Sequence, residues 1–260
     1  TSATQEKVYD GTALTNDDVK VSGDGFATGE GASYDVTGTQ TEVGSSANAF
    51  TYTLNDGTKA DNYTITKVEG TLTVTELTDK VTVTITEHSG TEKYDGTKKT
   101  ITGYDVEISN PLYKESYFTF SGTAEVQATD AGSYPMELKA GDFTNNSNNF
   151  TNVEFVIVDG TLEISKRTVT LTSATQEKVY DGTALTNDEV VVSGDGFAEG
   201  EGATYSVTGT ITEVGETANA FTYTLNDGTK ADNYEISKVE GTLKVTELTA
   251  KVTVTITEHS

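Results

Sequence analysis

Few residue types in this chain could do chemistry, and the sequence does not bring them together. The only histidines are His88 and His259, which occupy the same place in a repeat described below. One module therefore holds at most one histidine, so a two-histidine metal site within a module is excluded. We expect a strand-end histidine that faces water, because no Ser–Asp pair accompanies it. The chain has no cysteine, which excludes disulfides, thiolate metal sites and cysteine nucleophiles. No enzymatic function is expected.

Two polar stretches resemble phosphate or metal sites in composition. Residues 21–31 are rich in glycine, but they are acidic and lack the Lys-Ser/Thr ending of a P-loop, so they indicate a turn-rich connection. Residues 55–62, repeated at 226–233, offer several oxygen ligands for calcium. They have no EF-hand spacing and no closing bidentate glutamate, and Asp-Gly and Asn also suit a hairpin loop. We expect no cofactor and no metal.

A Lys–Asn isopeptide bond is another way to stabilise a module without cysteine. Asn62, Asn149 and Asn233 occupy matching places in the repeats. The lysines do not match, because Lys7 lies two positions before a repeated tyrosine and Lys93 only one position before it. On a strand this shift moves the side chain to the opposite face. The crosslink is therefore not expected as a design shared by all modules.

The chain is built from repeats. Residues 172–260 repeat residues 1–89 without a gap, and 77 of the 89 positions are identical. Duplication of a whole unit lengthens a protein or multiplies a weak binding site, whereas catalysis does not require a second copy of the unit. The pattern therefore indicates a segment of a repetitive protein.

A shorter repeat defines the modules. Tyr-Asp-Gly-Thr occurs three times, and each copy is followed by an Asn-aromatic pair and then by Gly-Thr-Leu. The predicted boundaries are module A at 1–77, module B at 78–165, module A′ at 166–247, and an orphan first strand of a further B module at 248–260. Residues 166–171 indicate the start of a strand that module A lacks. We expect the orphan segment at 252–257 to seek a sheet edge.

The first three residues of this motif, Tyr-Asp-Gly, are predicted to specify the fold. The tyrosine can close one end of the core while Asp-Gly turns the chain. The residues assigned to this structural motif are Tyr9, Asp10, Gly11, Tyr94, Asp95, Gly96, Tyr180, Asp181 and Gly182.

Short alternating runs predict an all-β fold. Residues 50–54, 72–75 and 81–86 alternate apolar and polar side chains, and Asp-Gly pairs separate such runs. We expect tandem antiparallel β-sandwich modules of immunoglobulin-like type. β-Grasp-like modules are the alternative, weakened by the absence of a clear helical pattern. Linkers of about five residues predict a semi-rigid rod of end-to-end modules.

Charge excludes several classes of partner. The net charge is −24, from 41 acidic and 17 basic residues. Such a surface repels nucleic acid and anionic membranes, so neither is expected as a partner. No apolar run is long enough to span a bilayer, which argues against membrane insertion of this segment.

Tyr-Asp-Gly-Thr, followed by Asn-Tyr and Gly-Thr-Leu-Thr-Val, resembles the YDG/MBG-type repeats of bacterial surface proteins and adhesins. Module B departs from the pattern, with Phe150 in place of the tyrosine and Gly160-Thr161-Leu162-Glu163-Ile164 at its end. The resemblance implies an extracellular location on the bacterial cell surface or wall, and a stalk or adhesive role. It marks no ligand-binding residue.

Two functions follow from these observations. The first is a structural spacer, or stalk, that projects a distal adhesive region from the cell and has neighbouring modules as its partners. The alternative is a multivalent array that binds mucin, a glycan or a host matrix protein weakly through each copy. Tyr113, Tyr117 and Phe118, beside Pro111, are the candidate ligand-contact loop, although the same rings could belong to the core.

Overall fold

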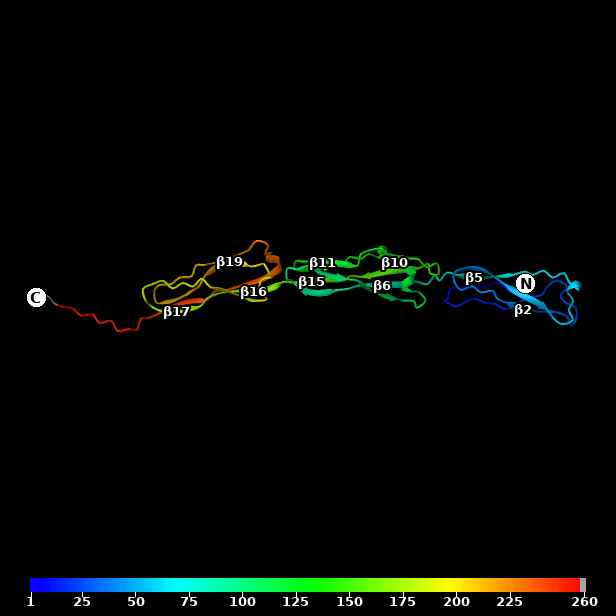
Figure 1. The fold of residues 1–260 in the computed structure, drawn as a ribbon, viewed down its shortest axis with the longest axis horizontal. Helices are drawn as coiled ribbons and strands as arrows, with labels where there is room; N and C mark the ends of the chain where they lie inside the picture. The colour runs from blue at the N-terminus through cyan, green and yellow to red at the C-terminus, as the bar shows by residue number, and fades with distance from the viewer. Residues whose placement is uncertain (258–260) are drawn as a thin grey trace. The chain divides into compact units, whose positions relative to one another are not determined.

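The computed structural model describes residues 1–257, and strands form nearly all of its regular structure (Figure 1). Within these residues, helical structure is limited to four three-residue 3₁₀ turns. The all-β prediction is confirmed. None of the helical turns described has the length or apolar character needed to cross a membrane.

The strands fall into two compact units, and module B contributes to both. Unit 1 holds Thr1–Glu87, Tyr104–Ala124 and Glu137–Asp159. Unit 2 holds His88–Gly103, Glu125–Met136 and the described residues from Gly160 onward. The transition from A to B therefore lies within unit 1, and the transition from B to A′ lies within unit 2.

Unit 1 contains two three-stranded sheets, ordered β1-β5-β3 and β14-β6-β9, and two hairpin-like pairs, β2-β4 and β10-β13. Its elements are β1 (Gln5–Val8), β2 (Ala32–Val36), β3 (Gly44–Asn48), β4 (Phe50–Leu54), η1 (Ala60–Asn62), β5 (Gly70–Thr75), β6 (Val81–Glu87), β9 (Tyr104–Ile108), η2 (Glu115–Tyr117), β10 (Phe118–Phe120), η3 (Ala140–Asp142), β13 (Phe143–Asn145) and β14 (Val153–Val158).

Unit 2 contains three three-stranded sheets, ordered β12-β15-β7, β18-β16-β22 and β17-β23-β20, and the pairs β11-β8 and β19-β21. Its elements are β7 (Gly90–Lys93), β8 (Lys99–Thr102), β11 (Glu125–Ala128), β12 (Gly132–Pro135), β15 (Thr161–Ser165), β16 (Arg167–Ser173), β17 (Gln176–Val179), β18 (Val190–Gly194), β19 (Ala203–Val207), β20 (Gly215–Ala218), β21 (Phe221–Leu225), η4 (Ala231–Asn233), β22 (Tyr234–Val239) and β23 (Thr242–Thr246).

In module A′ the chain enters and leaves along two long strand pairs that share one register. β16 pairs with β22 in parallel, starting at Arg167 opposite Tyr234. β17 then pairs with β23 in parallel, ending at Val179 opposite Thr246. The partner lies 67 positions further along the chain in both ladders, so the first and last parts of the module run side by side throughout.

This pairing differs from the wholly antiparallel sheets expected from the sequence. Parallel ladders join β1 to β5, β6 to β14, β7 to β15, β16 to β22 and β17 to β23. Parallel neighbours need a long crossover, which here is the body of the module, since some 60 residues separate the paired strands. Antiparallel strands such as β20 and β9 complete the sheets from the other side.

The predicted alternation sets the core of each unit. In β6, Val81, Val83 and Ile85 are fully buried, while the threonines between them are partly exposed. In A′ the core cluster consists of Leu185, Leu243 and Val245. Because successive strand residues point to opposite faces, the apolar residues of each strand gather on its buried face.

The Tyr-Asp-Gly-Thr motif forms a turn that one aspartate closes. The Asp10 carboxylate accepts hydrogen bonds from the backbone N–H and the hydroxyl of Thr12, at 2.9 and 2.8 Å, and from Lys7 Nζ at 2.7 Å. Gly11, between them, has a φ of +77°, which favours glycine. The motif at 180–183 is built in the same way.

In module B a different lysine stabilises this turn. Asp95 accepts from Thr97 in the same manner, but its lysine partner is Lys99, at 2.6 Å. Lys93 instead reaches Asp195, at 2.7 Å. The mismatch in lysine position seen in the sequence therefore reflects two ways of closing one turn.

The turn aspartates are expected to make the stability of the fold fall at low pH. Lys7, Lys99 and Lys178, together with the following threonines, hold the pKa values of Asp10, Asp95 and Asp181 well below the usual range. A lowered folded-state pKa contributes stability above the unfolded pKa of about 4, and that stability is lost as pH falls below it. We predict that replacing all three aspartates by asparagine flattens the fall in Tm between about pH 5 and pH 2. Parallel melting curves of the two chains check this, and equal slopes would contradict it.

Candidate functional site: the joints between modules

The side chains that could act in catalysis or bind a metal are not brought together in the structure. His88 lies within unit 2, with its ring Nδ1 2.8 Å from the carbonyl oxygen of Thr102. His259 lies outside the described residues. Among residues 1–257 no group of three His, Cys, Asp or Glu side chains is placed to hold a metal ion. The buried polar contacts instead lie between successive modules.

At the A–B joint, module B presents an asparagine side chain to a loop of module A. Asn149 is 5% exposed. Its Oδ1 accepts from the backbone N–H of Val43 at 2.9 Å, and its Nδ2 donates to the Glu42 carboxylate. Both functions of one amide are therefore used by two consecutive residues of the neighbouring module. Phe150, next in sequence, packs edge-on against Tyr9 with ring centroids 5.5 Å apart.

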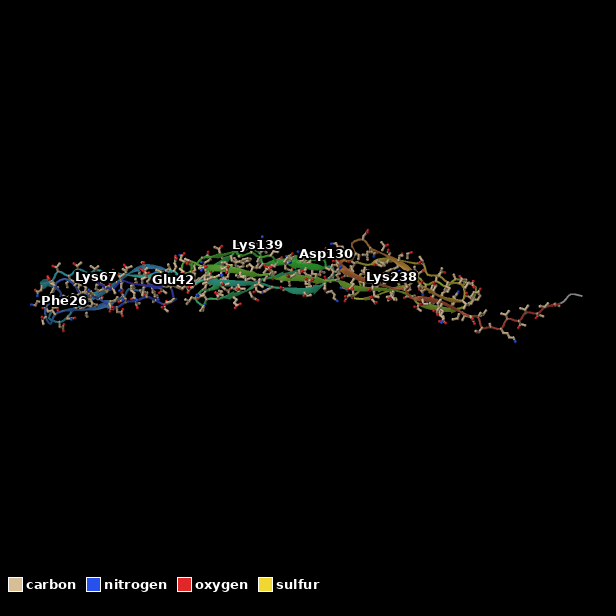
Figure 2. The ribbon with its side chains drawn as sticks, turned by 180° about the vertical axis from the view of Figure 1, so that it is seen from behind. Phe26, Glu42, Lys67, Asp130, Lys139 and Lys238 are labelled. Atoms are coloured by element: carbon tan, nitrogen blue, oxygen red, sulfur yellow. The ribbon has the colours of Figure 1, made fainter. Side chains whose placement is uncertain are left out.

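The B–A′ joint repeats this arrangement with different residues. Asn233 is fully buried, and its Oδ1 accepts from the backbone N–H of Ala131 at 2.7 Å. Its Nδ2 donates to Asp130 Oδ1 at 3.0 Å. Tyr234 packs edge-on against Tyr94, with centroids 5.6 Å apart. Figure 2 labels Glu42 and Asp130, the acidic partners of the two asparagines.

Each joint is thus a contact between two short sequences. One module supplies the motif tyrosine and an acidic-X-Gly tripeptide, and the next module supplies the Asn-aromatic pair. The tripeptides are Glu42-Val43-Gly44, Asp130-Ala131-Gly132 and Glu213-Val214-Gly215. Sequence reasoning identified the tyrosines and asparagines but missed this acidic partner, although its recurrence in all three modules was a usable signal.

One comparison with known proteins gives a match, to the middle module. Residues 81–166, about a third of the chain, match the family model of the MBG domain. The match covers nearly all of module B, which is referred to below as the MBG domain. This confirms the resemblance noted for the middle module, and the MBG domain is a non-enzymatic all-β module found in surface proteins. No curated protein and no solved structure matches the chain.

The face that A′ turns toward the MBG domain contains an aromatic–acidic cluster. Tyr234 packs against Phe197 at 5.2 Å, donates to Glu201 Oε2 at 2.6 Å and accepts from the N–H of Ala198 at 3.0 Å. Tyr94 of the MBG domain donates to the other oxygen of Glu201. One carboxylate therefore accepts from a phenol of each module.

Module A carries the same cluster without a preceding module among the described residues. Tyr63 packs against Phe26 at 5.1 Å, donates to Glu30 and accepts from Ala27 N–H at 3.0 Å. The corresponding asparagine, Asn62, is exposed, whereas Asn233 is fully buried. The face is thus formed before it is covered, so the joint needs little rearrangement of this side.

Charged side chains add a second set of contacts at the B–A′ joint. Lys93 of the MBG domain pairs with Asp195 of A′ at 2.7 Å. Arg167, where A′ begins, donates from Nε to the Gly196 carbonyl at 2.9 Å and from a terminal nitrogen to the Tyr94 carbonyl at 3.4 Å. The guanidinium therefore bonds to backbone on both sides of the joint.

One constellation at this joint contains the groups that an isopeptide bond would need. Lys230 Nζ lies 2.6 Å from Asp130 Oδ2, and Asn233 Nδ2 donates to the other oxygen of the same carboxylate. The hydrogen bond to Asp130 raises the pKa of Lys230, and Lys230 and Asn233 lower the pKa of Asp130. The ammonium and the carboxylate stabilise each other in their charged forms, which disfavours attack by a neutral amine.

The candidate ligand-contact residues pack against other rings of unit 1. Tyr113 is 3% exposed, and its ring meets Phe150 at 5.1 Å and Tyr117 at 5.6 Å. Phe118 is half-buried and packs edge-on against Phe155 at 5.4 Å. Tyr113 and Tyr117 therefore extend the aromatic cluster of the A–B joint, and their role as a ligand-contact loop stays a prediction.

The motif tyrosines of modules A and B lie at the joints, each on the side of the earlier module. Tyr9 and Tyr94 are buried at joints, whereas Tyr180, at the end of A′, is half-buried and packs on the A′ core. Gly11 lies against Leu112 of the MBG domain, and Gly96 lies near Ala198 of A′. A small residue lets the backbone of the turn approach the next module closely.

Asn233 offers a direct test of the joint. We predict that Asn233→Ala lowers the free energy of unfolding by about 1–3 kcal/mol, because it leaves the Ala131 N–H buried without its acceptor. Asn62→Ala, at the same repeat position in module A, should change it by less than about 0.5 kcal/mol, because Asn62 is exposed. Denaturant unfolding followed by circular dichroism measures both. Equal effects would show that the amide acts within its own module.

The phenols predict sensitivity to alkali. Burial, followed by the hydrogen bond to Glu201, raises the pKa values of Tyr94 and Tyr234 to about 12. A raised folded-state pKa contributes stability below the unfolded pKa of about 10, and that stability is lost as pH rises toward 12. We predict that Tyr94→Phe makes the fall in Tm between about pH 9.5 and 11.5 less steep. An alkaline slope that is the same in Tyr94→Phe and in the wild-type chain would contradict this.

Proposed function

We propose that this chain is a stalk segment of a bacterial surface adhesin, whose joints hold successive modules in a semi-rigid rod that projects a distal binding region from the cell. The main support is the agreement between the two joints. Each uses an asparagine amide, an acidic side chain, a backbone N–H and two aromatic rings, although the residues differ between them.

Chain composition supports the same proposal. A net charge of −24 keeps neighbouring copies soluble and apart. An extracellular location on the cell surface agrees with the kind of protein in which the MBG domain occurs. Secreted chains without cysteine need another source of stability, and each joint supplies buried hydrogen bonds and aromatic packing.

The alternative, a multivalent array for mucin, a glycan or a matrix protein, would need binding residues that remain free on each module. Of the three aromatic candidates, Tyr113 is buried within unit 1 against Phe150, and Tyr117 and Phe118 are half-buried. Some of the positions that differ between the two A copies, such as Ser33 and Thr204, are exposed strand residues. We therefore favour the spacer.

Two measurements on the same protein test the proposal. We predict that small-angle scattering of the 260-residue chain fits a narrow distribution of lengths, and that the double variant Asn149→Ala/Asn233→Ala broadens it. Asn62→Ala is the matched control and should leave the scattering unchanged. A wild-type distribution as broad as that of the double variant would rule out a semi-rigid stalk.

Binding to immobilised mucin and matrix proteins is the companion measurement. The stalk predicts no saturable binding by the 260-residue chain at any practical concentration. Saturable binding that weakens when Tyr117 or Phe118 is replaced by alanine would favour the array instead.

A further inference from the structure

The B–A′ joint brings together two tyrosines from different modules. Tyr94 and Tyr234 are 3% and 4% exposed, and their rings meet edge-on with centroids 5.6 Å apart and an interplanar angle of 84°. Both hydroxyls donate to one carboxylate, that of Tyr234 to Glu201 Oε2 at 2.6 Å and that of Tyr94 to Glu201 Oε1. The two phenols are therefore in ring contact, and their hydroxyls converge on the same group.

This geometry brings the reactive carbons of the two rings close together. In a phenol that has lost one electron and one proton, the unpaired electron is shared between the oxygen and the carbons ortho and para to it. The para carbon of tyrosine carries the Cβ, so two tyrosyl radicals join through their ortho carbons, the Cε atoms. The product, dityrosine, has its two hydroxyls side by side. Tyr94 and Tyr234 already have this arrangement, and such proximity turns a chance encounter into an intramolecular step.

Glu201 also provides an acceptor for the proton. A phenol that loses an electron becomes strongly acidic, so it is oxidised most readily where a base already accepts its hydrogen bond. Burial, followed by the hydrogen bond to Glu201, raises the pKa values of Tyr94 and Tyr234 to about 12, so both phenols carry their protons at neutral pH. The carboxylate can take a proton as the electron leaves. Electron transfer does not require contact, so an oxidant need not touch the buried rings.

Two other aromatic contacts show what is particular to this pair. At the A–B joint the ring against Tyr9 belongs to Phe150, which has no hydroxyl. Within module B, Tyr113 and Tyr117 meet edge-on with centroids 5.6 Å apart at 83°. The Tyr113 hydroxyl donates to the amide oxygen of Asn145 at 2.9 Å, which is not a base. The Tyr113–Tyr117 pair thus has the same ring contact without the shared carboxylate.

We propose that the B–A′ joint is a site of oxidative modification, at which a one-electron oxidant, such as a radical produced by a peroxidase, joins Tyr94 to Tyr234 through a Cε–Cε bond. Glu201 accepts the phenol proton. The crosslink fastens the two modules covalently in a chain that has no cysteine. It forms whether or not the chain acts as a stalk, because it depends only on the folded joint.

The atoms and electrons of this reaction balance. Each phenol gives one electron to the oxidant and one proton, through Glu201, to solvent. The two radicals couple, which forms the Cε–Cε bond. The hydrogens on the two bonded carbons then move as protons to the phenol oxygens, and both rings become aromatic again. The chain loses two electrons and two protons in total, and one molecule of hydrogen peroxide takes them up to give two molecules of water.

Photochemical oxidation of the 260-residue chain with ruthenium tris-bipyridine and persulfate tests the proposal. Trypsin places Tyr94 and Tyr234 in separate peptides, 94–98 and 231–238, each with a single tyrosine. We expect mass spectrometry to find these peptides joined, with two hydrogen atoms fewer than the separate peptides contain. The rate should not change with protein concentration, because the coupling is intramolecular. Oxidation of the chain unfolded in urea should not give this product in preference to others.

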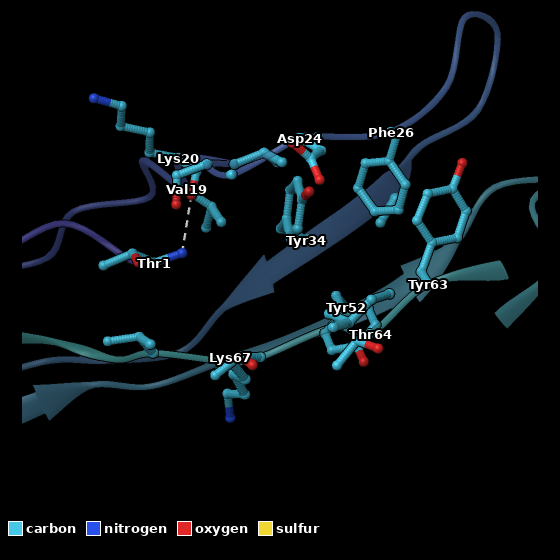
Figure 3. A pocket seen from close by; sticks show the side chains of 18 of the residues that line it. Thr1, Val19, Lys20, Asp24, Phe26, Tyr34, Tyr52, Tyr63, Thr64 and Lys67 are labelled. Carbon is cyan, nitrogen blue, oxygen red and sulfur yellow. Dashed lines mark hydrogen bonds between the residues drawn. The ribbon is translucent and has the colours of Figure 1, made fainter. Parts of the chain in front are cut away.

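Two matched variants test the carboxylate. Glu201→Gln keeps an oxygen that accepts a hydrogen bond but is not a base, so it should lower the initial rate of the 94–234 crosslink by about tenfold or more. Glu30 has the same repeat position in module A, where it accepts from Tyr63, beside Phe26 (Figure 3). Glu30→Gln should leave the 94–234 rate unchanged. Circular dichroism checks that both variants keep their strands.

The wild-type chain also contains its own comparison, which needs no variant. The Tyr113–Tyr117 pair should couple more slowly than the 94–234 pair, since its ring contact lacks a carboxylate. A Tyr113–Tyr117 product that forms as fast overturns the role of Glu201, as do equal 94–234 rates in the wild-type and Glu201→Gln chains. Crosslinks confined to exposed tyrosines such as Tyr52 and Tyr223, with no 94–234 product, overturn the proposed site itself.

Discussion

A buried asparagine amide fixes each joint, because both of its functions are used by two consecutive residues of the neighbouring module. Asn233 accepts from one backbone N–H and donates to one carboxylate, so a slip of the joint by a single residue would break both bonds. The adjoining aromatic contact adds burial without this directional demand. The hydrogen bonds therefore set the register of the joint, and the aromatic rings supply most of its buried apolar area.

At the B–A′ joint a single carboxylate also bonds to both modules. Glu201 accepts from Tyr234 of its own module and from Tyr94 of the module before it. In the A–B joint Tyr117 belongs to an aromatic cluster with Phe150 and Tyr113 instead. The same type of asparagine contact is thus supported by a shared carboxylate at one joint and by an aromatic cluster at the other. This explains why modules of unlike sequence can alternate in one chain.

Local features of the fold could be predicted, whereas its pairing could not. The alternation at Val81–Thr86 and the Asp-Gly turns depend on neighbouring residues, so strands and turns followed from them. The parallel ladders join residues 67 or 72 positions apart, and period-two alternation is the same for parallel and antiparallel strands. The partner of Asn233 at the joint was only half accessible to sequence reasoning: the acidic residue recurs in all three modules, but the other half is the backbone N–H donor of Ala131, which no side-chain pattern marks.

The parallel ladders have a mechanical consequence. In A′ the chain enters along β16 and β17 and leaves along β22 and β23, and each entering strand runs beside an exiting one in the same direction. Tension between the two ends of such a module pulls the paired strands past each other along their length. All the ladder hydrogen bonds then resist together, whereas strands pulled apart from one end would open one bond at a time. A shear geometry of this kind lets a small domain without disulfides withstand force.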